Sequence, residues 1–461
     1  MPAPLSPTGT ETPGTEAVHP DDRGAGLYRA LAAGDRRVGP RGTVAFAVST
    51  ADVDSGAGDV YVALGLGKYL ERLGWGVQLW PMEQWDTPVP EDVTVLVSMV
   101  ESFVPGLVPE HTALVAWVRN WTDTWADLPY LDEFDAVWAS STRAVERMAA
   151  KHRRRVSLMP IGVDLELFDG TQHQNDTTHQ NGTQPQNGTQ HQPQDTHRGT
   201  HPIDVVTTVN FWGAERLGTA AIDVLAESRD VVWYGANREH LVRSERIDHR
   251  GIASFFDLPA VYASSAFVVD DLIPPARKYA THNSRLFEGL ASGALVVTNC
   301  ADGLADLGLE DVPTYHDGPS LVDAVGERDD DLVARLRAVV VERHSYAARA
   351  AVADAALTEI VAERAGRPGA HRGAFLTWTT HLREQLRRTE RERDTHLSGV
   401  HDINGRLITA IEDAQRAAAA SDATIRTLSE ERDRLARRLD EVTRSRTFRL
   451  AERIARITGR R

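Results

Sequence analysis

The sequence has little cysteine and no long apolar run, and each shortage excludes a class of protein. Cys300 is the only cysteine among 461 residues, so the chain can form neither an intrachain disulfide nor a zinc site built from cysteines. No segment approaches the roughly 18 consecutive apolar residues of a membrane-spanning helix. The N-terminus also lacks the basic and apolar regions of a signal peptide. We therefore expect a cytoplasmic protein.

The sequence also has fewer basic than acidic residues. The chain has 51 Lys and Arg against 66 Asp and Glu, a formal net charge of −15. The deficit lies in the body of the chain, because residues 382–461 hold 19 Arg and 14 acidic residues, which leaves −20 on the preceding part. So acidic a body argues against binding to nucleic acid. The hydrophobic share of 41% is typical of soluble globular proteins, and the length exceeds that of one compact core.

Two segments of similar length carry the pattern of an α/β fold. Residues 41–168 and 203–366 each alternate short apolar runs with amphipathic stretches, which predicts a parallel sheet covered by helices on both faces. We expect residues 1–40 to form a disordered arm and residues 169–202, which are almost free of apolar residues, to form a low-complexity linker. The linker histidines are too irregularly spaced to favour a metal site. Paired domains of this kind bind ligands between them, at the carboxyl ends of their strands.

The C-terminal region has a different pattern. Residues 367–443 predict a helical coiled coil, because most of the positions of two seams, from Val400 to Val442 and from Asn404 to Leu439, are apolar at seven-residue spacing. This favours a homo-oligomer. The alternative is a solvated helix that packs back on the body of its own chain.

The last residues, 444–461, hold seven Arg and one Glu, with apolar residues gathered on one broad face of the expected helix. A basic amphipathic helix suits an anionic membrane surface, which would place the protein at the periphery of the inner face of the cell membrane. A frayed, solvated helix end fits the same pattern equally well.

The segment THNSRLFEGLASGALVVTN, residues 281–299, is the sharpest local signal. Asn283 or Ser284 caps a short predicted helix that points out of the strand ends. With Asn283 and Arg285, this helix N-terminus makes an anion site suited to a diphosphate. Glu288, one turn further along, offers a carboxylate that can accept both hydroxyls of a ribose. The alternative is a surface ion pair between Arg285 and Glu288.

A second candidate site element is the loop DVDSGAGD in the first domain. Its Gly56 and Gly58 let the backbone approach a ligand closely. Asp59, at the start of the next predicted helix, either contacts the sugar or the acceptor or serves as the N-cap, and we favour the N-cap. Arg119 and Asn120 end the apolar run ALVAWVRN and should reach the cleft.

The segment around Glu288 resembles the signature Asn-x-Arg-x-Phe-Glu-x-Leu-Ala-x-Gly-Ala of the glycosyl-transferases group 1 family, in the GT-B superfamily. The loop DVDSGAGD, the later segment PIGVDLELF and the pair NFWGAER and YGAN are similar to segments of that family in the same order. The resemblance covers roughly residues 43–360 and implies the GT-B fold, in which two Rossmann-like domains face a cleft.

The resemblance implies a nucleotide-sugar-dependent hexosyltransferase that needs no metal and no cofactor beyond its donor substrate. The acceptor it implies is a cell-surface glycan or its lipid-linked precursor, in polysaccharide biosynthesis of the cell envelope. By position, Glu288 would bind the ribose, Asn283 and Arg285 the diphosphate end, and Arg216 would neutralise phosphate charge. Gly56 and Gly58 would border the donor. The candidate catalytic residues are Asp59, Arg119 and Asn120.

The chain departs from the family pattern at one position. Many relatives carry a second Glu eight residues before the ribose-binding one, where this chain has Ala280. The departure puts the contacts to the donor sugar and the stereochemical outcome in doubt. It also leaves two rivals to the enzyme, a non-catalytic scaffold that acts through the coiled coil and a nucleotide-sugar epimerase of the same fold.

Overall fold

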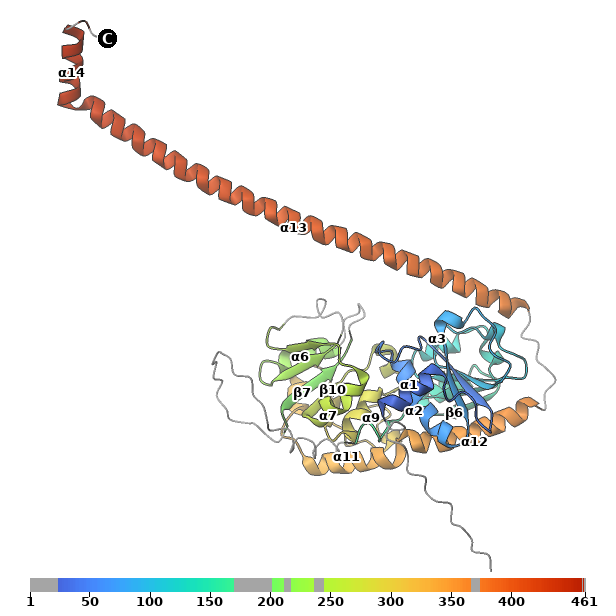
Figure 1. Cartoon of the computed structure of the whole chain (residues 1–461). Coiled ribbons are helices and arrows are strands. Elements are labelled where there is room, and N and C mark those ends of the chain that lie inside the picture. The colour runs from blue at the N-terminus through green and yellow to red at the C-terminus, as the bar shows by residue number, and fades with distance from the viewer. Residues whose placement is uncertain are drawn as a thin grey trace, which may run out of the picture. The chain divides into compact units, whose positions relative to one another are not determined.

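The computed structural model divides the chain into two compact units, Met1–Leu382 and Arg383–Arg461. The first unit holds two α/β domains, drawn from blue to cyan and from green to yellow in Figure 1. The residues that the structure describes are 24–169, 201–210, 217–235, 244–365, 374–457 and 459. The expected linker therefore lies, apart from its two ends, outside the described residues.

The first domain is built on a six-stranded sheet in which every pairing is parallel, with the strand order β2-β1-β3-β4-β5-β6. The strands are β1 (Thr43–Val48), β2 (Gly76–Pro81), β3 (Val93–Ser98), β4 (Ala113–Val118), β5 (Ala136–Ala139) and β6 (Arg155–Leu158). Every residue of β1, β2, β4 and β5 is buried, because helices cover both faces of the sheet.

The first domain has one helix before β1 and three that follow β1, β4 and β5. They are α1 (Ala25–Ala33), α2 (Gly58–Arg72), α3 (Thr122–Ala126) and α4 (Thr142–Ala149). Helix α1 packs against α2 and buries Leu27, Tyr28 and Leu31. The expectation of a disordered arm over residues 1–40 is therefore wrong for the part that contains α1, since three spaced apolar side chains were enough to dock a short helix.

The second domain has a five-stranded parallel sheet with the order β11-β10-β7-β8-β9. Its strands are β7 (Ile203–Thr208), β8 (Val231–Tyr234), β9 (Asp248–Gly251), β10 (Ser265–Asp270) and β11 (Leu295–Thr298). Its described helices are α6 (Leu217–Leu225), α7 (Leu258–Ala263), α8 (Pro274–Lys278), α9 (Ser284–Ala291), α10 (Gly318–Ala324) and α11 (Asp330–Arg343). The predicted fold class, two parallel-sheet α/β domains with a C-terminal helical region, is confirmed.

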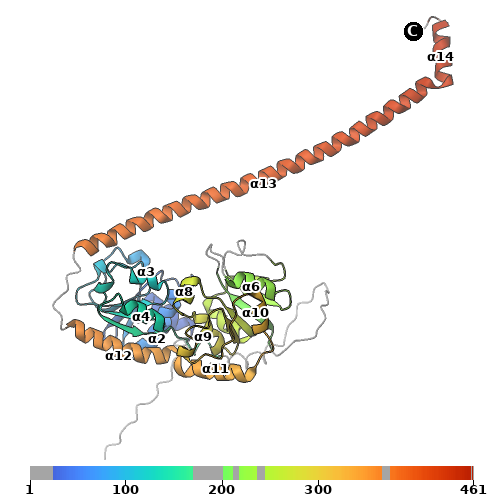
Figure 2. The same cartoon turned by 180° about the vertical axis from the view of Figure 1, so that it is seen from behind.

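The chain crosses between the domains twice, and the two crossings are hydrogen-bonded to each other. The backbone N–H of Val163 donates to the carbonyl of His344, and the N–H of Tyr346 donates to the carbonyl of Val163, both at 2.9 Å. Helix α12 (Tyr346–Ala365) then packs against α2. In Figures 1 and 2, α11 lies along the second domain and α12 along the first. The last helix of the segment 203–366 therefore belongs in space to the first domain.

A buried ion pair lies beside this crossing. Lys68 of α2 is fully buried, and its Nζ lies 2.8 Å from a carboxylate oxygen of Asp164 and 2.8 Å from one of Glu166. The hydroxyls of Tyr28 and Tyr69 donate to Asp164 as well, at 3.1 and 2.8 Å. A buried charge needs this many partners, because desolvation otherwise outweighs the Coulomb attraction. The network fixes α1 and α2 to the start of the first crossing.

Helix α13 (Ala374–Arg444) begins inside the first unit. Leu376 is buried, and the Thr377 hydroxyl donates to the carbonyl of Gly106 at 3.2 Å. A side chain at Gly106 would collide with the Leu376 backbone. The predicted coiled-coil segment 367–443 therefore starts too early, because the first turns of α13 pack on the first domain.

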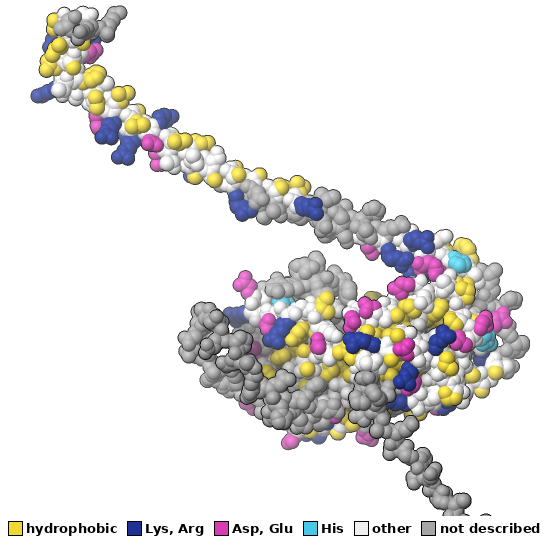
Figure 3. Space-filling model, viewed as in Figure 1, with side chains coloured by type: hydrophobic (Ala, Val, Ile, Leu, Met, Phe, Trp, Pro, Cys, Tyr) yellow, Lys and Arg dark blue, Asp and Glu magenta, His cyan; other side chains and the backbone are white. Residues whose placement is uncertain are grey.

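Beyond Leu382, α13 presents its seam to solvent. Seven large apolar side chains of the two predicted seams are exposed: Leu407, Ile411, Ile425, Leu428, Leu435, Leu439 and Val442. Figure 3 shows such apolar side chains, in yellow, along α13 and the following helix α14 (Arg446–Ile457). Among the helices described, none is both long and apolar enough to cross a membrane. Pairing of the seam in a coiled coil stays a prediction.

Candidate active site

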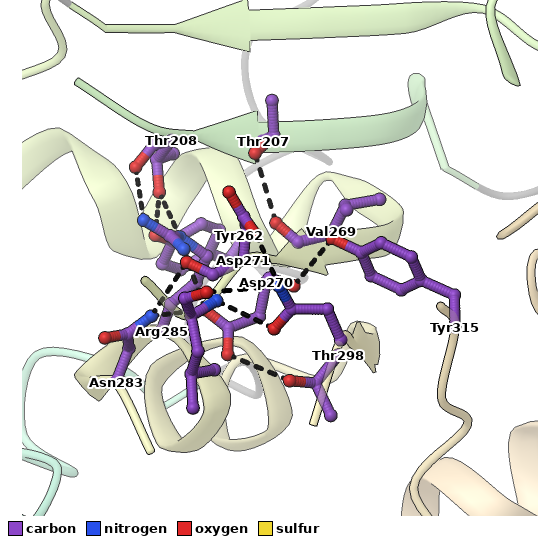
Figure 4. A network of polar contacts seen from close by, with 12 residues as sticks. Thr207, Thr208, Tyr262, Val269, Asp270, Asp271, Asn283, Arg285, Thr298 and Tyr315 are labelled. Carbon is purple, nitrogen blue, oxygen red and sulfur yellow. Dashed lines mark hydrogen bonds and ion pairs between the residues drawn. The ribbon is translucent and has the colours of Figure 1, made fainter. Parts of the chain in front are cut away.

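The carboxylate of Asp270, the last residue of β10, is fully buried and joins the ends of neighbouring elements. Asn283 Nδ2 donates to its Oδ1 at 2.9 Å, Arg285 Nη1 pairs with the same oxygen at 2.7 Å, and Thr298 Oγ1 donates to Oδ2 at 3.3 Å. Figure 4 shows the three side chains converging on Asp270. A buried carboxylate is tolerated here because charged and neutral donors replace its water.

Arg285 is held on its other side by β7. Its Nε donates to Thr208 Oγ1 at 2.8 Å, and its Nη2 donates to the Thr208 carbonyl at 2.5 Å. The Thr208 hydroxyl is in turn 2.7 Å from the hydroxyl of Tyr262 (Figure 4). The guanidinium therefore ties the start of α9 to the ends of β7 and β10, which makes it rigid. Its predicted contact with a diphosphate stays a prediction.

Helix α9 carries Glu288 one turn from its start. Asn283 occupies the N-cap position, but its side chain makes no capping hydrogen bond, since it is bonded to Asp270 instead. Glu288 is 7% exposed. Burial raises the pKa of Glu288 to about 7, with Asp270 acting in the same direction and the Ser284 hydroxyl and Arg285 opposing it. At neutral pH the group is divided between its acid and its carboxylate form.

The opposite wall comes from the loop between β1 and α2. Gly56 has a φ of 73°, and a Cβ built on Gly56 or Gly58 would meet open space, so the loop presents bare backbone. The Asp59 carboxylate accepts hydrogen bonds from the backbone N–H and the hydroxyl of Ser49, at 2.6 and 2.8 Å. The favoured N-cap role of Asp59 is wrong, because Ala57 is the N-cap and Asp59 instead fastens the start of α2 to the end of β1.

Arg119 and Asn120 follow β4 on the same wall. Arg119 Nη2 donates to the carbonyl of Met99 at 2.9 Å, while Arg119 Nε and Asn120 Oδ1 are buried and have no hydrogen-bond partner in the structure. Burial lowers the pKa of Arg119, and the charge of Asp59 opposes that shift. Buried polar atoms without partners are rare in folded proteins, and beside a cavity they mark positions where a ligand supplies the missing bonds.

These elements enclose one cavity of about 620 Å³ between the two domains. It is bordered on one side by Gly56, Gly58, Asp59, Arg119 and Asn120, and on the other by Asn283, Arg285 and Glu288. The ring of Tyr61 from α2 stacks on Phe255 of the second domain at 3.9 Å between centroids and joins the two walls. Eight of the nine predicted site residues thus meet at one cavity. The ninth, Arg216, lies outside the described residues.

Comparison with known proteins gives this arrangement a context. Residues 213–354 match the model of a family described as glycosyl transferase-like. Sucrose-phosphate synthase from Thermosynechococcus elongatus is 13% identical, with a TM-score of 0.51 over 69% of this chain and 99% of that one. The chain therefore shares the two-domain fold of this synthase. No curated protein matches the sequence.

Two further solved structures are similar to this chain at lower scores. HepE of Anabaena in complex with UDP-glucose is 11% identical, with a TM-score of 0.49 over 68% of this chain and 99% of that one. AviGT4, a glycosyltransferase of avilamycin A biosynthesis, is 14% identical, with a TM-score of 0.47 over 69% of this chain and 98% of that one.

The buried centre of this site was not predicted from the sequence. Asp270, Thr208 and Tyr262 were not singled out, although they fix Arg285 and α9. One signal was present: Asp270 and Asp271 directly follow the apolar run AFVV, and two consecutive acidic residues at the end of a buried strand are costly unless they are bonded. Thr208 and Tyr262 gave no comparable signal, since both residue types are ordinary in α/β cores.

The raised pKa of Glu288 predicts a stability effect. Between pH 4.5, the ordinary value for Glu, and about 7, the native state keeps a proton that the unfolded state releases, so the free energy of unfolding falls as pH rises through this window. Glu288→Gln removes this dependence, worth on the order of 3 kcal/mol. We expect the melting temperature of Glu288→Gln to rise relative to that of the unsubstituted chain between pH 5 and pH 8. An equal difference at both pH values would contradict the assignment.

Proposed function

We propose that this chain is a nucleotide-sugar-dependent hexosyltransferase that acts without a metal ion. The observation that carries the proposal is the position of Glu288, a buried carboxylate on the wall of a 620 Å³ interdomain cavity, one turn inside the helix whose N-terminus opens on the same cavity. A carboxylate can accept two neighbouring hydroxyls at once, which is the geometry that a ribose offers. The helix N-terminus beside it favours a diphosphate.

The reaction breaks the bond between the anomeric carbon of the sugar and a diphosphate oxygen. It forms a bond from that carbon to the oxygen of an acceptor hydroxyl, whose proton is released to water or to the leaving diphosphate. Negative charge develops on the leaving diphosphate. In this chain Arg285, held rigid by Asp270 and Thr208, and the first turn of α9 face that position, while Arg119 faces it from the other domain. Preorganised donors and positive charge of this kind lower the barrier without a metal ion.

The first test is binding. Glu288→Gln keeps the size of the side chain and removes the charge, so we expect affinity for one of UDP, GDP, dTDP or ADP to fall about tenfold or more at pH 8, in line with a lost hydrogen bond to a charged group. Isothermal titration calorimetry measures it. Glu310→Gln, at an exposed position of the same domain, is the matched control and should bind as the unsubstituted chain does.

The outcomes of this titration separate the candidate functions. Nucleotide binding that Glu288→Gln leaves unchanged would remove the ribose role. Selective binding of one nucleoside diphosphate, together with slow hydrolysis of the corresponding sugar donor, supports a transferase. Binding without any turnover of donor sugars would instead favour the scaffold, the rival for which the Ala280 departure argues.

The acceptor that we propose is a cell-surface glycan or its lipid-linked precursor, and the features that support it lie in α14. Successive residues of a helix are 100° apart, which places the exposed Phe448, Leu450, Ile454 and Ile457 on one half of α14. The arginines at positions 446, 449, 453 and 456 occupy the other half. An apolar face bordered by arginines binds an anionic lipid surface, where a lipid-linked acceptor resides.

Vesicle sedimentation tests the membrane contact. The full chain should sediment with vesicles that contain phosphatidylglycerol and stay in solution with phosphatidylcholine alone, and a chain that ends at Thr443 should bind neither. Ile454→Asp should weaken binding as much as the truncation does, because it puts a charge into the apolar face. Equal sedimentation of the full and shortened chains would show that α14 does not bind lipid.

We further propose that α13 pairs with a second copy through its exposed seam. Leu428 and Leu435 are 60% and 59% exposed in the single chain, and pairing would remove both from water. Leu428→Asp should lower the molar mass measured by light scattering to that of the monomer. Ala423→Asp, on the outer face of the same helix, should leave the mass unchanged. A monomeric unsubstituted chain would refute the pairing.

A further inference from the structure

A second cavity, of about 260 Å³, adjoins the first one at the point where the chain crosses between the domains. Its lining includes Ser140 and Thr142 after β5, Leu307 of the second domain, and Arg343, His344 and Arg349 at the crossing. We call it the hinge pocket. His282 and Ile161 line both cavities and so form the wall between them. The glycosyl transfer proposed above takes place in the first cavity and does not use the hinge pocket.

Three charged residues line the hinge pocket, and Arg349 is half-buried while Arg343 and Asp306 are exposed. Arg349 Nη2 lies 2.6 Å from Nδ1 of His344, and Arg349 Nε is buried without a hydrogen-bond partner. No ion pair joins Arg349 to a carboxylate among the residues that the structure describes. Burial lowers the pKa of Arg349. A half-buried guanidinium with an unused N–H donor is a group suited to binding an anion.

His344 orients the guanidinium without adding charge. Its Nε2 is 2.8 Å from the carbonyl of Leu307, an atom that only accepts, so Nε2 carries the proton and Nδ1 accepts from Arg349. Burial lowers the pKa of His344 to about 4, so the ring is neutral at physiological pH. The ring is thereby fixed from both sides, and Arg349 is fixed with it.

Two more polar groups in the lining lack partners. Ser140 is 7% exposed and His282 5% exposed, and neither Ser140 Oγ nor His282 Nδ1 has a hydrogen-bond partner in the structure. His282 Nε2 lies 2.9 Å from the carbonyl of Asp302, so it is the donor and Nδ1 is an unfilled acceptor. The pocket thus offers a cation and a hydroxyl to an anion, together with one acceptor that takes a donor such as an O–H.

We propose that the hinge pocket binds a small phosphorylated molecule that carries an O–H, of which inorganic phosphate is the simplest. Phosphate oxygens meet Arg349 and Ser140, and the O–H donates to His282. Such a ligand touches both domains and the crossing between them. One of its contacts, His282, also lines the first cavity. The proposal does not depend on which reaction that cavity performs.

The test compares phosphate with sulfate on the full chain at pH 7.5 and constant ionic strength. Sulfate has a similar size and charge but no O–H at this pH, so it leaves His282 unfilled. We expect 10 mM phosphate to raise the melting temperature about 2 °C more than sulfate does, because a ligand that binds only the native state stabilises it. Arg349→Gln should abolish the difference. Arg335→Gln, an exposed arginine on α11, should retain it.

A second variant and a competition with nucleotide complete the test. If circular dichroism shows that Arg349→Gln is unfolded, Ser140→Ala replaces it and should lose at least half of the difference. The phosphate effect should persist at saturating concentrations of any nucleoside diphosphate that the chain binds. Equal shifts with the two anions, a difference that survives in the folded pocket variant, or an effect that nucleotide removes would each overturn the proposal. The last outcome would place phosphate in the first cavity instead.

Discussion

The candidate site depends on one buried carboxylate. Asp270 ends β10, an interior strand of the second sheet, where its charge can be kept only if donors replace the lost water. The donors come from α9 and from β11, and Arg285 reaches on to β7. Satisfying Asp270 therefore determines where α9 begins and which way it points. The position of Glu288, one turn along, follows from the same bonds.

This arrangement explains why Asn283 and Arg285 are engaged inward although they stand at the start of a helix. A helix N-terminus binds anions through its backbone N–H groups, and an N-cap side chain would compete for them. Here the Asn283 side chain is drawn away by Asp270, and no capping hydrogen bond from it forms. The side chains at this helix start secure the structure, and the backbone N–H groups of the first turn stay available to a ligand.

The sequence predicted what depends on local pattern. Alternation of apolar and amphipathic segments located both sheets, and the residues around Glu288 indicated the helix that now borders the cavity. Prediction from the sequence failed where tertiary contacts determine the role of a residue. Asp59 stands in a sequence position typical of an N-cap. Its carboxylate instead accepts hydrogen bonds from Ser49, ten residues earlier. The link from Thr208 to Arg285 joins residues 77 positions apart, which no local pattern can reveal. Helix α1 was missed because its few apolar residues follow a Pro- and Gly-rich stretch.

The placement of α12 makes the second domain an insertion within the first. Asp354 of α12 receives hydrogen bonds from Arg41 and from the indole of Trp75, at 3.1 and 2.8 Å, and Arg364 donates to the carbonyl of Glu110 at 2.8 Å. During synthesis these partners emerge from the ribosome some 250 residues or more before α12 does. The first domain must therefore wait, with one face of α2 uncovered, until the whole second domain has been translated. Its folding is completed last, although its sheet is made first.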